Sequence, residues 1–285
     1  MTATSVPDRS WVIGKHAILS LRALRRNGRT EVDPIARRTP YQWQGVHYQD
    51  HDDQPFLLVH NSAGGFVEGD VAELTIHAEP GTRTLMTTSA ATKYYKCEEE
   101  GEAHDLVTIT AGADALFEYL PDEVIPFAGS RIMRRTRIWL EASSRAFVAD
   151  ALAAGRVHYG SGEAFQFTSL RSELELRVGG QLMLLDRLDV PNAVDTEALQ
   201  RLWHGRHYLG TVVVHAPDLS AEMAELLAAQ TPLADGVLLG VSHRGNILCA
   251  RVLAREAWQL HAAIYRIWEA LRPALAGKPA RPISK

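Results

Sequence analysis

The chain of 285 residues contains few cysteines, no long hydrophobic run and no excess of positive charge. Its two cysteines, Cys97 and Cys249, lie far apart, which argues against a disulfide framework and favours a reducing compartment. No stretch approaches the roughly 18 uninterrupted apolar residues of a membrane-spanning helix, and the first residues lack the pattern of a secretory signal. A net charge of -4 argues against a dedicated nucleic-acid binder. We therefore expect a soluble, cytoplasmic protein without a membrane or nucleic-acid partner.

Hydrophobic residues make up 46% of the chain, which is enough to bury a sizeable core. We predict a single domain over residues 1–285 with three parts. Residues from about 30 to 195 read as short strands separated by small-residue turns, because β-branched and aromatic residues are frequent and helical periodicity is weak there. Residues from about 196 to 275 mix helices and strands, and residues 276–285 are predicted to form a loose tail.

A repeat is visible in the strand-rich part. Strand–turn–strand units have turns that begin at Pro80, Ala111 and Ala142, at equal spacing along the chain, and a fourth turn begins at Val178 after a somewhat longer interval. Because one such unit cannot bury its apolar face alone, stacked units sharing a core are favoured. The repeat predicts a mainly β (α+β) fold with a β-helix or solenoid-like body of stacked strands and appended C-terminal helices. The alternative is a chance recurrence of turn signals in an ordinary β-sandwich.

Polar residues recur at one position of this repeat. Counting from each turn, Thr88, Tyr119, Asp150 and Asp186 fall just past the second strand of their units. If the units stack, these side chains line one ridge or groove.

The last third of the sequence changes character. Ser220 is a good N-cap for a helix that stops near residues 231–232. Strands are expected at about 236–241 and 246–253. A longer helix with an apolar stripe runs from about 255 to 271, and Pro273 is expected to end it.

The glycine-rich segment from Gly64 to Asp70 lacks the Gly-Lys-Ser/Thr ending of a phosphate-binding loop. Its glycines indicate a loop that requires positive φ angles or close backbone approach. On physical grounds alone, Asp70 is expected to brace this turn.

No motif points directly to catalysis or tight metal binding. The sequence contains no Gly-x-Ser-x-Gly elbow, no His-Glu-x-x-His and no Cys-x-x-Cys. His204 and His207 lie close together in the chain. Separately, Cys97 precedes an acidic run and His104, and this segment is either a weak soft-metal site or, more simply, a solvated acidic loop. The arginine-rich segment 131–137 reads as a strand with a solvated face, a protected sheet edge, or a docking surface for an acidic partner.

Five segments in order resemble the urease accessory protein D family, also called UreD or UreH. They cover most of the chain from about residue 56 to 272. The matching segments are the Gly-Gly-Phe-Val-Glu-Gly-Asp of 64–70, the Leu-Met-Thr-Thr-Ser-Ala-Ala-Thr-Lys-Tyr-Tyr of 85–95, the Phe-Glu-Tyr-Leu-Pro-Asp-Glu-Val-Ile-Pro-Phe of 117–127, Gly-Arg at 155–156 with Gly-Glu-x-Phe at 162–165, and Ile-Trp-Glu-Ala-Leu-Arg at 267–272. The residues that carry the motifs are Gly64, Gly65, Gly69, Thr92, Lys93, Glu118, Pro121, Glu123, Arg156, Trp268 and Arg272.

The resemblance implies a β-helix-like body with appended helices that acts as a scaffold and is not an enzyme. Family members join the F and G accessory proteins, of which G is a GTPase, on the urease apoprotein. The family is associated with an internal polar route for nickel, so transient nickel(II) and no tightly bound cofactor are expected. By this analogy, Asp70, Thr88, Asp150 and Asp186 are the candidates for the nickel route.

Two other functions remain open at this point. Stacked-strand solenoids also carry carbohydrate-active sites built on acidic pairs, for which Asp150 and Asp186 would be the catalytic carboxylates. Alternatively, the chain is a stand-alone metallochaperone that binds nickel tightly through His204, His207 or Cys97.

Overall fold

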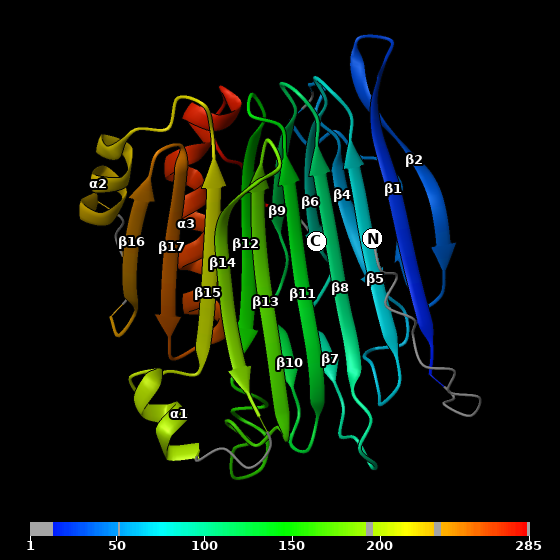
Figure 1. The fold of residues 1–285 in the computed structure, drawn as a ribbon, viewed down its shortest axis with the longest axis vertical. Coiled ribbons are helices and arrows are strands. Elements are labelled where there is room, and N and C mark those ends of the chain that lie inside the picture. Colours follow the sequence, from blue (N-terminus) through cyan, green and yellow to red (C-terminus); the bar gives the residue numbers. More distant parts are fainter. Residues whose placement is uncertain (1–13, 51, 192–195, 231–234, 284–285) are drawn as a thin grey trace.

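The computed structural model describes residues 14–50, 52–191, 196–230 and 235–283, and this part of the chain is mainly β, as expected (Figure 1). Two mixed sheets face each other, and a long C-terminal helix covers the outer face of one of them. The first sheet has the order β14-β13-β11-β8-β5-β1-β2. Its strands are β1 (His16–Arg26), β2 (Arg29–Arg38), β5 (Val71–Ala78), β8 (Ala103–Ala111), β11 (Arg131–Leu140), β13 (Ser169–Val178) and β14 (Gln181–Val190).

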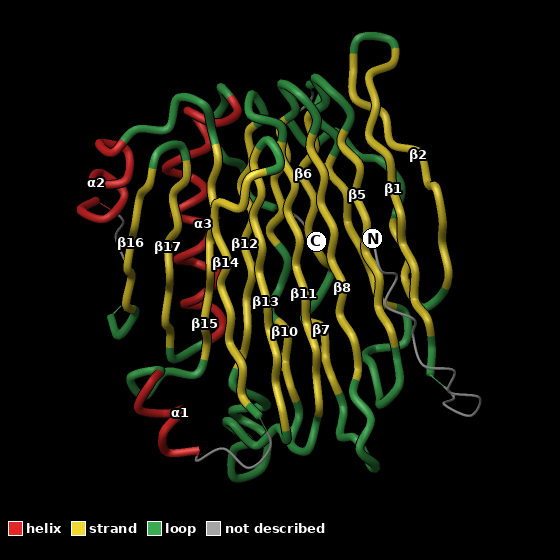
Figure 2. The backbone as a smooth tube through the Cα atoms, viewed as in Figure 1, coloured by secondary structure: helices red, strands yellow, loops and turns green. Residues whose placement is uncertain are grey.

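The second sheet has the order β16-β17-β15-β12-β9-β6-β4-β3, with β10 and β7 attached at the side. Its strands are β3 (Tyr41–Trp43), β4 (Phe56–Asn61), β6 (Arg83–Thr88), β7 (Thr92–Tyr94), β9 (Leu116–Leu120), β10 (Val124–Pro126), β12 (Arg145–Ala153), β15 (Tyr208–His215), β16 (Leu238–Arg244) and β17 (Ile247–Ala254). The described helices are α1 (Thr196–Leu202), α2 (Ala221–Gln230) and α3 (Ala257–Ala276). Figure 2 shows these strands running side by side, with α1 and α2 at the margin.

Three of the repeat units contribute one strand to each sheet. The pairs β5 and β6, β8 and β9, and β11 and β12 form parallel ladders in the two sheets. The prediction that the units are equally spaced along the chain is wrong, however. Leu74 is the register partner of Val107, and Val107 is that of Thr136, so the step from the first unit to the second is longer than the step from the second to the third.

The unequal steps also change which of the polar residues predicted to be equivalent lie at the same level of the second sheet. Met86, Tyr119 and Val148 are register partners in the second sheet. Thr88 and Asp150 each lie two residues beyond this level, so they are equivalent to each other, whereas Tyr119 lies two residues earlier than expected. The fourth unit differs more, because β13 and β14 form an antiparallel hairpin within the first sheet. Asp186 therefore reaches the interior from the opposite sheet.

Alternating side chains produce two apolar layers. In β5 every second residue is buried, which is the pattern of a strand with one face on the core. The residues between the two sheets form one core cluster, which contains Leu19, Ile76 and Phe117. A second cluster lies between the ten-stranded sheet and α3 and contains Phe147 and Trp268. The molecule thus has three layers, formed by the two sheets and α3.

The C-terminal third follows the expected order of elements. The backbone N–H of Met223 donates to Ser220 Oγ at 3.3 Å, so Ser220 caps α2 as predicted, while the predicted stop at 231–232 lies outside the described residues. The expectation that Pro273 ends the last helix is wrong, because α3 continues to Ala276 and closes at Gly277, whose N–H donates to the Pro273 carbonyl. The tail expected to be loose is held in part, since Lys278 Nζ lies 2.7 Å from Asp50.

The arginine-rich strand β11 lies between β8 and β13. The interpretation as a protected sheet edge is therefore wrong. Arg135 and Arg137 share the outer face, as alternation predicts, and Arg134 points into the protein. In the described ranges, no helix combines the length and apolar character needed to cross a bilayer.

Candidate functional site

A polar cavity of about 120 Å³ lies between the two sheets. It opens among the strands β6, β9 and β12 of one sheet and β5, β8 and β11 of the other. Its polar lining comprises Tyr41, Asn61, Thr88, Ser89, Thr92, Lys93, Asp105, Tyr119, Asp122, Arg134, Thr136 and Asp150. Carboxylates and hydroxyls inside an otherwise apolar core are unusual, and they make this cavity the main candidate for function.

Arg134 organises the charges in this cavity. Its guanidinium lies 2.6 Å from Asp150 and 3.4 Å from Asp105. The side chain of Arg134 is 7% exposed and that of Asp105 is 9% exposed. With both carboxylates ionised, these three side chains carry a formal charge of -1. A buried charge is stable only when it is paired and hydrogen-bonded, and Arg134 provides that pairing inside the protein.

The electrostatics of this group reflect burial and pairing together. Burial raises the pKa of Asp105 above its usual value, although Arg134 acts in the opposite direction. Burial works to lower the pKa of Arg134, but the carboxylates of Asp150 and Asp105 outweigh it and raise the pKa above its usual value. Arg134 is therefore a permanent cation. An incoming metal ion has to compete with it for the carboxylates, which disfavours tight binding.

A second, smaller cavity of about 20 Å³ shares Asp150 with the first. It is lined by Ser172, Asp186, Thr211 and Arg251, among others. Asp186 is paired with Arg251 at 2.8 Å. Asp150 borders both cavities, and the oxygen-bearing side chains of Thr88 and Asp186 line the first and the second cavity, respectively.

Three of the four residues predicted for a polar route therefore line the two cavities. Thr88 is in the first, Asp186 in the second, and Asp150 in both. Thr88 Oγ1 accepts a hydrogen bond from the backbone N–H of Asp122 at 2.8 Å, which fixes the loop after β9 against β6. Asp70 is not among the residues that line either cavity.

Asp70 is fully buried in the glycine-rich turn and has a different set of contacts. Its carboxylate accepts hydrogen bonds from the backbone N–H groups of Lys15 at 2.5 Å and Val67 at 3.0 Å. The carboxylate thus braces the turn before β5 and ties the start of β1 to it. This is the structural role expected from the residues alone, and it differs from the role implied by the resemblance.

We expect Asp70→Ala to lower the free energy of unfolding by about 1–3 kcal/mol, because two backbone N–H groups lose their buried acceptor. Urea denaturation followed by circular dichroism measures this loss. Asp33→Ala is the matched control, since Asp33 is 43% exposed and pairs with Arg26 at the surface. Equal stability of the two variants would contradict the bracing role.

The other motif residues mostly hold the scaffold. A side chain at Gly65 would lie 2.7 Å from the Lys93 carbonyl, so this position admits only glycine against β7. Gly69 has a φ of 78°, a conformation that glycine adopts without strain. The backbone N–H of Thr92 donates to the Glu123 carbonyl at 3.0 Å. Three more motif residues, Gly64, Lys93 and Pro121, line the larger cavity.

Two ion pairs, one buried and one partly exposed, account for further motif residues. Glu118 is fully buried and accepts hydrogen bonds from Trp268 Nε1 at 2.6 Å and Arg272 Nε at 3.2 Å, which joins α3 to β9. Arg156 pairs with Glu163, and its guanidinium lies over the Phe127 ring at 4.2 Å from the ring centroid.

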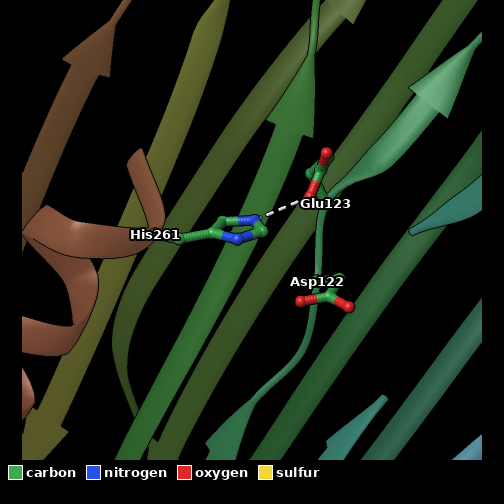
Figure 3. A group of neighbouring side chains, drawn as sticks. All are labelled: Asp122, Glu123 and His261. Carbon is green, nitrogen blue, oxygen red and sulfur yellow. Dashed lines mark hydrogen bonds and ion pairs between the residues drawn. The ribbon is translucent and has the colours of Figure 1, made fainter. Parts of the chain in front are cut away.

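The histidines and cysteine considered for tight metal binding do not form a group of three ligands in the described ranges. Cys97 is 7% exposed, and burial raises the pKa of its thiol, which disfavours the thiolate form that binds metals. Within those ranges, one group of three metal-binding side chains lies close together, namely Asp122, Glu123 and His261 (Figure 3).

Sequence reasoning missed several residues of the site. Arg134 was detectable, because alternation along 131–137 places it on the face opposite Arg135 and Arg137, together with apolar neighbours. Asp105 and Asp122 carried no distinguishing pattern. His261 is 138 residues away from Glu123 along the chain, and only the packing of α3 brings the two together.

Comparison with known proteins relates the chain to one family. The family model described as UreD urease accessory protein matches residues 15–284. A protein named urease accessory protein UreD 2 from Brucella suis biovar 1 is 29% identical over 93% of this chain and 89% of its own length. Urease accessory protein UreD from Cupriavidus pinatubonensis is 29% identical over 99% and 96%, and that from Herpetosiphon aurantiacus is 32% identical over 79% and 81%.

Proposed function

The chain belongs to the UreD family of urease accessory proteins, and from that premise we propose that it relays nickel(II) to the urease apoprotein through its two linked cavities. A member of this family is an accessory protein in urease maturation and not itself an enzyme. The observation that supports the relay most directly is the position of Asp150, which borders both cavities. Together with Thr88 and Asp186, it gives an ion oxygen ligands at successive points along the interior.

The chemistry of these ligands fits passage better than storage. A site with nanomolar affinity would hold the ion by about 12 kcal/mol and release it slowly. Here Asp150 is paired with Arg134 and Asp186 with Arg251, so each carboxylate already has a cationic partner. An ion that exchanges with a guanidinium gains little net free energy and is free to move on. Nickel(II) is therefore cargo, and no tightly bound cofactor is proposed.

The relay requires partners at both ends, because an internal route delivers ions only where its openings meet other proteins. We propose that the chain acts as a scaffold in a complex with the F and G accessory proteins, with G as the GTPase, on the urease apoprotein in the cytoplasm. Its thiols support a reducing location, since Cys97 and Cys249 are both free.

The decisive experiment is the nickel content and activity of urease purified from the host with and without this gene. We expect urease made without the chain to be nickel-poor and inactive, and re-expression of the chain to restore both. Equal amounts of urease protein in the two strains are the control. Fully metallated urease in the deletion strain would reject the proposed function.

A further inference from the structure

Asp122, Glu123 and His261 bring carboxylate and imidazole donor atoms to one place outside the series of residues described above (Figure 3). Their ligand atoms all lie within 4.8 Å of one another, and His261 Nε2 is 2.7 Å from Glu123 Oε2. Asp122 and Glu123 belong to the segment between β9 and β10, whereas His261 lies on α3. The side chain of His261 is 42% exposed and that of Glu123 is 8% exposed, so the group extends from the surface into the protein.

The backbone holds these side chains in place. The neighbours of His261 on α3, Leu260 and Ile264, are buried against the ten-stranded sheet, which fixes the orientation of the helix. Asp122 is fixed by the hydrogen bond from its N–H to Thr88 Oγ1. A ligand set carried on two anchored elements needs little reorganisation to close around an ion.

The separations suit a metal ion. Two ligand atoms that each lie about 2.1 Å from an ion are roughly 3.0–3.4 Å apart in octahedral or tetrahedral geometry. The nitrogen and oxygen of His261 and Glu123, which lie 2.7 Å apart, need to separate by a few tenths of an ångström to admit an ion. The atoms of the group lie within 4.8 Å of one another, so the Asp122 carboxylate needs to approach by up to about 1.5 Å, which a side-chain rotation allows. An imidazole with two carboxylates favours a borderline divalent ion such as nickel(II) or zinc(II) over magnesium or calcium, which prefer oxygen ligands alone.

The group is continuous with the interior. Asp122 also lines the 120 Å³ cavity, and its neighbour Thr88 is part of the same lining. We infer that Asp122, Glu123 and His261 form a surface site for a divalent transition-metal ion beside this cavity, on the side that Asp122 lines. His261 receives the ion from solvent, and Asp122 presents it to the interior. The identity of the ion as nickel(II) rests on the proposed function, whereas the site itself rests on this geometry.

The test is isothermal titration of nickel(II) into the purified full chain without a polyhistidine tag. We expect one saturable site in the unmodified protein and a loss of affinity of at least about tenfold in both His261→Gln and Asp122→Asn, since even outer partners of a metal site contribute roughly 10–100-fold. X-ray absorption at the nickel edge is expected to detect one imidazole that His261→Gln removes.

His158→Gln is the matched control. His158 Nε2 lies 2.9 Å from Glu256, so this pair reproduces the histidine–glutamate contact at the surface, and it is not part of a group of three ligands in the described ranges. It is expected to bind nickel like the unmodified protein. Asp122→Asn leaves the contact between His261 and Glu123 intact, so it keeps the test decisive if His261→Gln does not fold.

Two results would overturn the site. One is the absence of saturable binding to the unmodified chain, and the other is unchanged affinity in both His261→Gln and Asp122→Asn. Failure of the proposed function looks different: urease from the deletion strain would be fully metallated while the purified chain still bound nickel through His261.

Discussion

Arg272→Met is expected to lower the free energy of unfolding by about 3–5 kcal/mol, because it removes the cation from a buried ion pair and leaves the charge of its partner uncompensated. Arg272 is 1% exposed and its partner Glu118 is fully buried. After the substitution, Glu118 keeps the N–H of Trp268 at 2.6 Å and the amide of Gln54 at 2.7 Å, which are neutral donors. Urea denaturation followed by far-ultraviolet circular dichroism measures the effect.

Arg272 makes further contacts that the substitution also removes, which adds to the loss of stability. Arg272 also lies 2.7 Å from Asp50 and covers the Trp268 ring at 4.5 Å, so it joins α3 to the loop before β4 as well as to β9. Burial works to raise the pKa of Asp50, but Lys278 and Arg272 outweigh it and lower the pKa. The C-terminal helix is thus attached to the ten-stranded sheet through polar contacts in addition to its apolar face.

Two further variants make this prediction specific. Adding Glu118→Gln to Arg272→Met removes the unpaired charge, and we expect the double variant to recover part of the lost stability. Arg171→Met is the exposed control, because Arg171 is 64% exposed and lies 3.8 Å from Asp189; exposed pairs contribute roughly 0–1 kcal/mol. A loss in Arg272→Met no larger than in this control would show that the buried pair does not stabilise the fold.

Much of the fold was accessible from local sequence patterns. The frequency of β-branched and aromatic residues and the small-residue turns identified the strand-rich part, and the Ser220 cap located α2, whereas β1 lies before the predicted start of that part. The register between neighbouring strands was not accessible from the sequence. A shift of one strand by an even number of residues keeps every side chain on the same face. Alternation therefore cannot distinguish equal sequence intervals between the repeat units from the unequal intervals observed. The fourth unit differs from the others in forming a hairpin, and the sequence signals this through the consecutive glycines Gly179 and Gly180. Both have positive φ angles and form the tight turn.

The site was accessible only in part, for a related reason. Thr88 and Asp150 were found because the repeat places them two units apart, and the longer first step and the shorter second step cancel over that interval. Asp186 enters from the hairpin of the other sheet, so its position next to Asp150 depends on how the sheets face each other. No pattern along the sequence encodes that distance, just as none brings His261 to Glu123.

Asp150→Asn tests the proposed interior route at the residue that borders both cavities. The substitution preserves volume and keeps an oxygen for Arg134, but it changes the formal charge of the group of Asp105, Arg134 and Asp150 from -1 to zero. We expect the nickel content of urease from a strain carrying only this variant to fall by roughly tenfold or more, in line with the effect of altering groups around a metal path. Nickel and urease protein are measured together in the purified enzyme.

The controls separate passage from structure. Asp218→Asn changes a carboxylate that is also paired with an arginine, Arg145 at 2.6 Å, but is 66% exposed and is not among the residues that line either cavity; normal nickel content is expected. Asp186→Asn is expected to reduce nickel as Asp150→Asn does, because in the proposed route the ion passes both residues in series. If Asp150→Asn prevented the chain from co-purifying with its partners, the residue would be structural. Full nickel content with intact assembly would mean that the ion does not pass Asp150, because a neutral amide cannot replace the attraction of a carboxylate for a divalent cation.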